Sequence, residues 1–262
     1  MFKKLAICTP AILDLDVIQI TANTIKKNLI DVNPDFDISF FVSVDNYQRD
    51  GATGSFNDIR ECYENLQTDN CNVEVIITGI RLGLNSNYKL LMKKFIDSDC
   101  THCLFIDDDY QLINELHLSD IASVFSEDVI VHLSAAKKEV AESFSHESPF
   151  LINEIKHEAA NTVVYLNNRN FHTGPGTFFS KQQAEQIYDE VDFSQKKANS
   201  EDLIGHANSY RSKDIVTVFF KTENMQFVEN EEWNLPLNNH FLYDSIRALS
   251  GQSAAELLDY NP

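Results

Sequence analysis

The first 110 residues alternate between two hydrophobic periods, and this alternation restricts the fold more than any other feature of the sequence. Short apolar runs, typical of strands buried on both faces of a sheet, lie at Leu5 to Thr9, Ile38 to Val44, Val73 to Thr78 and His102 to Ile106. Between them, apolar residues recur at helical spacing near residues 18–29, 56–66 and 88–95. A repeated strand–helix unit predicts a mainly parallel sheet with helices on both faces.

The second half of the chain is less regular than the first. We expect a helix near 114–126, strands near 128–133, 162–166 and 215–220, and helices near 181–190 and 201–210. No linker, repeat or low-complexity segment divides the sequence, and 43% hydrophobic residues provide enough apolar material for a large core. The sequence therefore predicts one α/β domain over residues 1–262.

Charge and cysteine content bear on the environment and the partners of the protein. The formal net charge of −19 disfavours nucleic acid as a partner, although pairs of lysines could form a local basic patch. Five cysteines are an odd number, and the N-terminal apolar run is interrupted by Asp14 and Asp16 without a cleavage site or an apolar stretch of about 20 residues. We expect reduced thiols, no membrane span and a cytoplasmic location.

Polar residues or glycine follow each of the four N-terminal strands, at Thr9, Asp45, Gly79 and Asp107. Ligands of open α/β sheets bind beyond the carboxyl ends of the strands, so these positions are candidates for a binding site.

Three consecutive carboxylates, Asp107, Asp108 and Asp109, follow the fourth strand. Crowded carboxylates repel each other unless a cation neutralises them, and their oxygens favour Mg²⁺ or Mn²⁺, ions that also bridge diphosphates. In an extended segment Asp107 and Asp109 point to the same side and can share one metal ion, which leaves Asp108 as the most dispensable ligand. The alternative interpretation is an acidic turn that caps the next helix.

At this run the sequence resembles the GT-A class of glycosyltransferases, whose D-x-D signature also follows a hydrophobic strand. Upstream, Gly83-Leu84-Asn85-Ser86-Asn87 before an apolar helix is similar to the segment that leads to that strand in the family. Asp45 is placed like the nucleotide-binding aspartate of the family.

The likeness continues downstream of the acidic run. Gly174-Pro175-Gly176, followed by a strand and a serine-capped helix, and then Glu201-Asp202-Leu203-Ile204-Gly205, resemble fringe-like and β1,3-galactosyltransferase-like members. The resemblance implies a GT-A-like, Rossmann-type fold with a nucleotide-binding half at 1–110 and an acceptor-binding half at 111–262. It also implies a metal-dependent, inverting transfer of a sugar from a nucleotide sugar to a hydroxyl acceptor, and we expect a UDP-sugar as the donor.

By the same resemblance we expect the nucleotide sugar to contact Thr9, Asp45, Asn85, Asp107, Asp108, Gly174 and Gly176. Asp109 would bind the metal directly, while Asp107 would hold the ribose or a metal-bound water. His240 lies where many GT-A enzymes bring a C-terminal histidine to the metal, and His172 beside the glycine loop is a rival for that role. A mixed carboxylate and imidazole site suits Mn²⁺ better than Mg²⁺.

Transfer also needs a base that takes the proton of the acceptor hydroxyl, and Asp202 is our candidate. Ser200-Glu201-Asp202 reads equally as the start of a helix, with Ser200 as the cap and the acids next to the positive end of the helix dipole. The two interpretations are compatible.

Several alternatives stay open at this point. The acceptor can be a glycan, a protein side chain or a hydroxymethylated base in DNA. A sugar-phosphate nucleotidyltransferase uses a similar sheet and acidic site, but Cys8-Thr9-Pro10-Ala11 lacks the basic glycine-rich loop typical of that class. A module that binds a cation or a basic partner on the same fold is the non-enzyme alternative.

Overall fold

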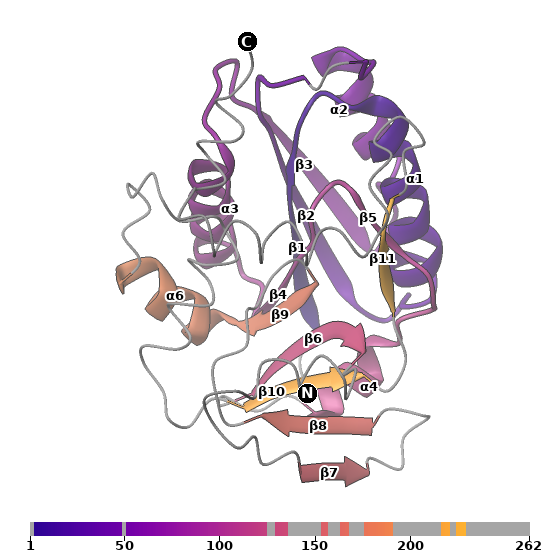
Figure 1. The fold of residues 1–262 in the computed structure, drawn as a ribbon, viewed down its shortest axis with the longest axis vertical. Coiled ribbons are helices and arrows are strands. Elements are labelled where there is room, and N and C mark those ends of the chain that lie inside the picture. The colour runs from indigo at the N-terminus through magenta and orange to yellow at the C-terminus, as the bar shows by residue number, and fades with distance from the viewer. Residues whose placement is uncertain are drawn as a thin grey trace, which may run out of the picture.

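The computed structural model describes residues 3–48, 51–124, 129–135, 153–156, 163–167, 176–190, 216–220 and 224–228. Within these residues a nine-stranded sheet of order β3-β2-β1-β4-β9-β6-β10-β8-β7 forms the centre of the molecule. Helices α1 (Leu15–Ile25) and α2 (Phe56–Glu64) lie on one side of its N-terminal part, and α3 (Leu84–Asp97) and α6 (Lys181–Glu190) lie on the other (Figure 1).

The four strands predicted in the N-terminal half are confirmed. They are β1 (Lys4–Ala11), β2 (Asp37–Val44), β3 (Cys71–Ile77) and β4 (His102–Phe105), and all their pairings are parallel. Leu5 lies opposite Ile38 on one side and His102 on the other, so β1 is the central strand of this group. Their carboxyl ends therefore meet at one end of the sheet, which we call the carboxyl end.

The second half of the chain extends the same sheet. The strands are β6 (Val129–Ala135), β7 (Asn153–Lys156), β8 (Val163–Asn167), β9 (Thr177–Ser180) and β10 (Val216–Phe220). Strand β9 is antiparallel to both β4 and β6, β10 is parallel to β6, and β8 is antiparallel to both β10 and β7. All described strands of this sheet except β8 and β9 thus run in one direction, which confirms the mainly parallel sheet.

Alternation along the strands divides the core into two layers. Leu5, Ile7, Leu104 and Ile106 pack with α1 and α2, whereas Ala6, Cys8, Cys103 and Phe105 pack with α3. This is the period of two that a strand buried on both faces requires. No described helix has the length and apolar character that crossing a membrane requires.

The helices in the second half fit the sequence prediction in part. Helix α6 matches the predicted helix near 181–190, whereas α4 (Leu118–Val124) begins four residues after the predicted start at 114. The predicted helix near 201–210 lies outside the described residues.

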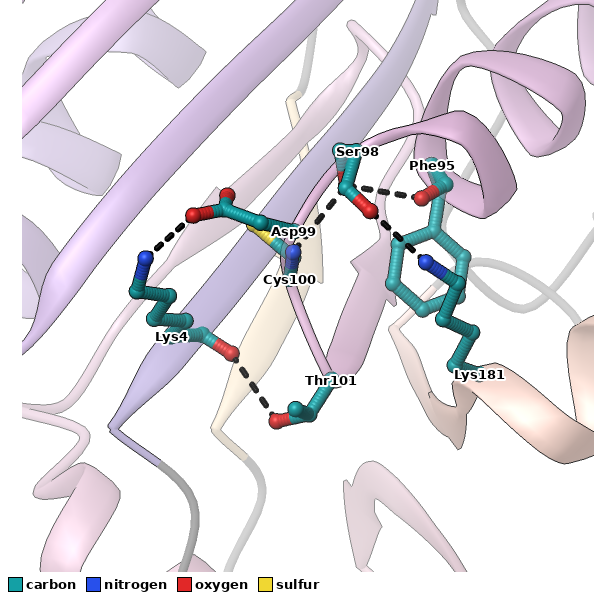
Figure 2. Close-up of polar contacts among 7 residues, drawn as sticks. All are labelled: Lys4, Phe95, Ser98, Asp99, Cys100, Thr101 and Lys181. Atoms are coloured by element: carbon teal, nitrogen blue, oxygen red, sulfur yellow. Dashed lines mark hydrogen bonds and ion pairs between the residues drawn. The ribbon is translucent and has the colours of Figure 1, made fainter.

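A set of polar contacts at the opposite end of the sheet joins α3, β4 and α6 (Figure 2). The Lys181 side chain at the start of α6 donates to the Ser98 carbonyl at 2.7 Å, and its backbone N–H donates to the Thr101 carbonyl at 2.8 Å. Lys4 and Asp99 form an exposed ion pair beside them, which contributes little to stability. The position of β4 between β1 and β9 is therefore held at its start by backbone and side-chain hydrogen bonds from α6.

Two buried asparagines hold the segment that follows the acidic run. Asn28 lies in a turn of π-helix, η1 (Lys26–Ile30), and its side chain donates to the Leu112 carbonyl at 2.6 Å. Asn33 donates to the carbonyls of Leu29 and Leu116 at 2.6 and 2.7 Å and accepts from the Leu118 N–H at 2.7 Å. Each amide therefore satisfies buried backbone groups that water cannot reach.

We predict that Asn33→Ala lowers the free energy of unfolding by about 2–3 kcal/mol, because it leaves buried backbone groups of three residues without partners. Urea denaturation followed by circular dichroism measures the change. The matched control is Asn65→Ala, since Asn65 is exposed at the end of α2, and its effect should stay within about 0.5 kcal/mol. Equal losses in the two variants would show that the Asn33 hydrogen bonds contribute no specific stabilisation.

Candidate functional site

The acidic run forms a turn at the carboxyl end of the sheet. Asp107 follows β4 and Ile106, and the Tyr110 N–H donates to the Asp107 carbonyl at 3.3 Å. The extended segment that the sequence predicts therefore stops at Asp107, and simple alternation does not extend to Asp109. This corrects the expectation that Asp107 and Asp109 share a side because the strand continues. We call Asp107–Asp109 the acidic turn.

Each residue of the acidic turn is held by a different element. The Tyr88 hydroxyl on α3 donates to Oδ1 of Asp107. The Ile12 N–H, just beyond β1, donates to Oδ2 of Asp108 at 2.8 Å. The Val228 N–H donates to the Asp109 carbonyl at 2.7 Å. Asp108 and Asp109 are 6% and 9% exposed, whereas Asp107 is half-buried.

The backbone contact of Asp108 gives this residue a structural task. Its carboxylate ties the end of β4 to the first residue after β1, the neighbouring strand. A buried carboxylate is stable only when such donors replace its water. The expectation that Asp108 is the least necessary of the three as a metal ligand stays a prediction.

Asp45, beyond β2, contacts the loop that leads into α3. Its Oδ1 accepts from the Leu82 N–H at 2.7 Å and its Oδ2 from the Gly83 N–H at 2.8 Å, and the residue is 4% exposed. Gly83 precedes α3 with a φ of 76°, a conformation that glycine adopts without strain. Asp45 thus determines where the loop of residues 79–83 lies at the carboxyl end of the sheet.

Arg81, a cationic side chain at the carboxyl end of the sheet, was not among the site residues predicted from the sequence. The guanidinium of Arg81 lies 4.6 Å from the ring centroid of Tyr47, and the Leu13 N–H donates to the Tyr47 carbonyl at 2.8 Å. These contacts bring the loops after β1, β2 and β3 together. The sequence places Arg81 in a loop after a predicted strand. That position indicates a site residue only once the strand order is known.

Thr9 and Gly176 are both inside the structure rather than on its surface. Thr9 is 0% exposed, and its hydroxyl has no hydrogen-bond partner among the described residues. The Gly176 N–H donates to the Phe105 carbonyl at 2.6 Å, and its carbonyl accepts from Leu133 at 2.9 Å. Its φ is 87°, and an added Cβ would lie 2.2 Å from the sulfur of Met225. Glycine at 176 is therefore required by packing and by backbone conformation.

Strands β5 (Tyr110–Leu112) and β11 (Met225–Phe227) form a separate antiparallel pair next to the acidic turn. Tyr110 pairs with Phe227, and the following residue, Val228, makes the contact with Asp109. The segment that leads to His240 therefore starts at the acidic turn.

Several predicted site residues lie outside the described part of the chain. They are His172, Gly174, Asp202 and His240, and for Asn85 the structure describes the backbone in α3 but not the side chain. Among the described residues no three His, Cys, Asp or Glu side chains are grouped so that they could hold a metal ion. The metal site therefore stays a prediction that needs residues from the undescribed segments.

Comparisons with known proteins find a likeness in structure alone. No protein-family model matches the sequence, and no curated protein matches it. A crystal structure of TarS from S. aureus superimposes with a TM-score of 0.54 and 13% identity, covering 92% of this chain and 39% of TarS. A second, of TarS 1-349, gives a TM-score of 0.54 and 15% identity, covering 94% of this chain and 64% of that one.

This chain thus spans less than two thirds of either TarS structure. TarS is a GT-A-type glycosyltransferase; at these identities the likeness shows the fold alone, and it does not extend to the fringe-like subgroup. The observed sheet order and helix placement agree with this comparison: the protein has an α/β, Rossmann-like fold of the GT-A type.

Proposed function

We propose that this protein is a metal-dependent glycosyltransferase that moves a sugar from a UDP-sugar to a hydroxyl acceptor. One observation carries the proposal: the acidic turn lies at the carboxyl end of a GT-A-like sheet, where the ends of β1, β2 and β4 converge. This is the end at which open α/β sheets bind ligands.

The N-terminal half of the chain contains side chains suited to binding a nucleoside diphosphate. Arg81 carries a positive charge beside Tyr47, and guanidinium groups recognise phosphate oxygens through paired hydrogen bonds. The Tyr47 ring presents an aromatic surface of the kind on which bases stack. In this proposal Asp45 and Thr9 lie beneath the nucleoside at the carboxyl end of the sheet, and Asp107 binds the ribose.

The donor set of the acidic turn fits a hard divalent cation. Consecutive carboxylates offer the oxygen ligands that Mn²⁺ and Mg²⁺ prefer, and Asp109 is the residue we assign to direct contact. We assign His240 as the ligand that completes the site; it follows Val228, whose N–H donates to the Asp109 carbonyl, by twelve residues in the sequence. When bound, the metal would stabilise the negative charge that develops on the diphosphate leaving group.

The acceptor half supplies the proton chemistry in this proposal. Asp202 accepts the proton of the acceptor hydroxyl while that oxygen attacks the anomeric carbon from the face opposite the diphosphate, which inverts the configuration. The support is the resemblance of Glu201-Asp202-Leu203-Ile204-Gly205 to GT-A sequences. The acceptor hydroxyl can belong to a glycan, a protein side chain or a modified base, and the net charge of −19 favours the first two.

We predict that UDP binds more tightly than GDP, CDP or ADP, and that Mn²⁺ strengthens its binding. Isothermal titration calorimetry with each nucleotide, with and without Mn²⁺, measures both effects. Asp109→Asn should weaken UDP binding in Mn²⁺ by about 10-fold or more, because it removes a charged metal ligand.

The control for this titration is Asp35→Asn, which neutralises an exposed carboxylate in the connection before β2. It should leave the UDP dissociation constant unchanged. Nucleotide binding that ignores both Mn²⁺ and the Asp109→Asn substitution would refute the metal-dependent site.

We predict that Asp202→Asn lowers the rate of sugar transfer about 10²- to 10⁴-fold, the usual range for loss of a general base. Release of UDP from UDP-glucose, UDP-galactose and UDP-N-acetylglucosamine, with water as the acceptor, provides an assay that needs no identified acceptor. The UDP dissociation constant should stay at its wild-type value, since the asparagine lacks only the proton-accepting charge. A variant with unimpaired turnover would remove Asp202 from the role of base, and intact metal binding without any turnover in the wild type would favour a binding module.

A further inference from the structure

Asp107 lies on the α3 side of the sheet. Along β4, Cys103 and Phe105 pack under α3, whereas Leu104 and Ile106 pack on the opposite side. Side chains alternate along extended backbone, so Asp107 continues the row of Cys103 and Phe105. Its Oδ1 accepts a hydrogen bond from the hydroxyl of Tyr88, one turn into α3.

Aromatic packing holds the ring of Tyr88 in place. The residue is 1% exposed, and its ring is stacked on that of Phe105 with the centroids 5.3 Å apart and an interplanar angle of 12°. Phe105 in turn meets Phe179 of β9 edge-on, with the centroids 6.2 Å apart. A ring packed in this way cannot swing, and the position of its hydroxyl is therefore set by β4 and β9.

The hydrogen bond from Tyr88 suits a role of Asp107 in which its carboxylate oxygens must keep one orientation. A half-buried aspartate can rotate about two side-chain bonds, and ligand binding then has to restrict that rotation. A neutral donor restricts it beforehand without cancelling the charge that attracts a cation or a ribose. Hydrogen bonds to ionised acceptors are also stronger than those between neutral groups.

We propose that Tyr88 is a positioning residue of the acidic turn, whose hydroxyl sets the orientation in which Asp107 meets the metal-bound nucleotide. This inference rests on the proposed function. Tyr88 acts through Asp107, because its own ring is enclosed between α3 and the sheet.

A double-mutant cycle tests this role. Tyr88→Phe should weaken UDP binding in Mn²⁺ about 10-fold, the size expected for one hydrogen bond to a charged group. In the Asp107→Asn background the same substitution should cause less than a twofold further change, because the carboxylate on which it acts is gone. Calorimetric dissociation constants of wild type, both single variants and the double variant complete the cycle.

Thr21→Val is the control. It also removes a hydroxyl from a fully buried side chain, but the Thr21 hydroxyl has no hydrogen-bond partner among the described residues. We expect its UDP dissociation constant to equal that of the wild type. Thermal unfolding of each variant checks that the fold is kept, and Tyr88→Met serves as a second hydroxyl-free variant where Tyr88→Phe does not fold.

The outcomes separate the two levels of the proposal. Wild-type protein that binds none of the four nucleotides would overturn the proposed function and the role of Tyr88 with it. Wild-type binding combined with an unchanged constant for Tyr88→Phe would overturn the role of Tyr88 alone. Equal losses of UDP affinity from Tyr88→Phe in the wild-type and Asp107→Asn backgrounds would also overturn the role of Tyr88. They would show a packing effect that does not act through Asp107.

Discussion

The hydrogen bond from the Ile12 N–H to the Asp108 carboxylate is the contact on which the candidate site depends. It joins the ends of the two adjacent central strands, β1 and β4, at the point where both leave the sheet. With Asp108 turned toward β1, the residue before it faces α3 and the residue after it enters the turn closed by Tyr110. This contact therefore fixes the point at which the acidic turn leaves the sheet.

The second half of the protein is joined to this centre through strand β9. Gly176 hydrogen-bonds to Phe105 on one side and to Leu133 on the other, so it links β4 to β6. Its missing side chain leaves space for Met225 of β11, which runs beside the acidic turn. The glycine loop that resembles a substrate-binding element in the sequence thus has a packing role at Gly176.

The features that the sequence could predict are those encoded by local periodicity. The four N-terminal strands and α6 were predicted because buried strands and amphipathic helices repeat within a few residues, and the strand order then placed Asp45 and Asp107 at one end of the sheet. The sequence offered an acidic turn as one of two interpretations, but the contacts of Asp108 and Asp109 with Ile12 and Val228 could not be predicted, because those residues are distant in sequence. The closeness of Arg81 to Tyr47 was missed for the same reason.

The later start of α4 also has a long-range cause. Asn33 accepts a hydrogen bond from the N–H of Leu118, the first residue of α4, and donates one to the carbonyl of Leu116 before it, so the helix begins later than the apolar pattern suggests. The hydrogen bonds of a buried side-chain amide more than eighty positions earlier in the chain therefore outweigh the local helix propensity.

The pairing of β5 with β11 also constrains the order in which the protein can assemble. Residues 110–112 find their partners only at 225–227, and a loop of that length closes late because its entropy cost precedes any gain from the contact. The parallel strands β1 to β4 can form from the first half of the chain as it is synthesised. The backbone donor for Asp109 becomes available only after Val228 has been synthesised. The parallel strands β1 to β4 would then form before the acidic turn is complete. A nascent chain would therefore have its sheet in place before its candidate metal site.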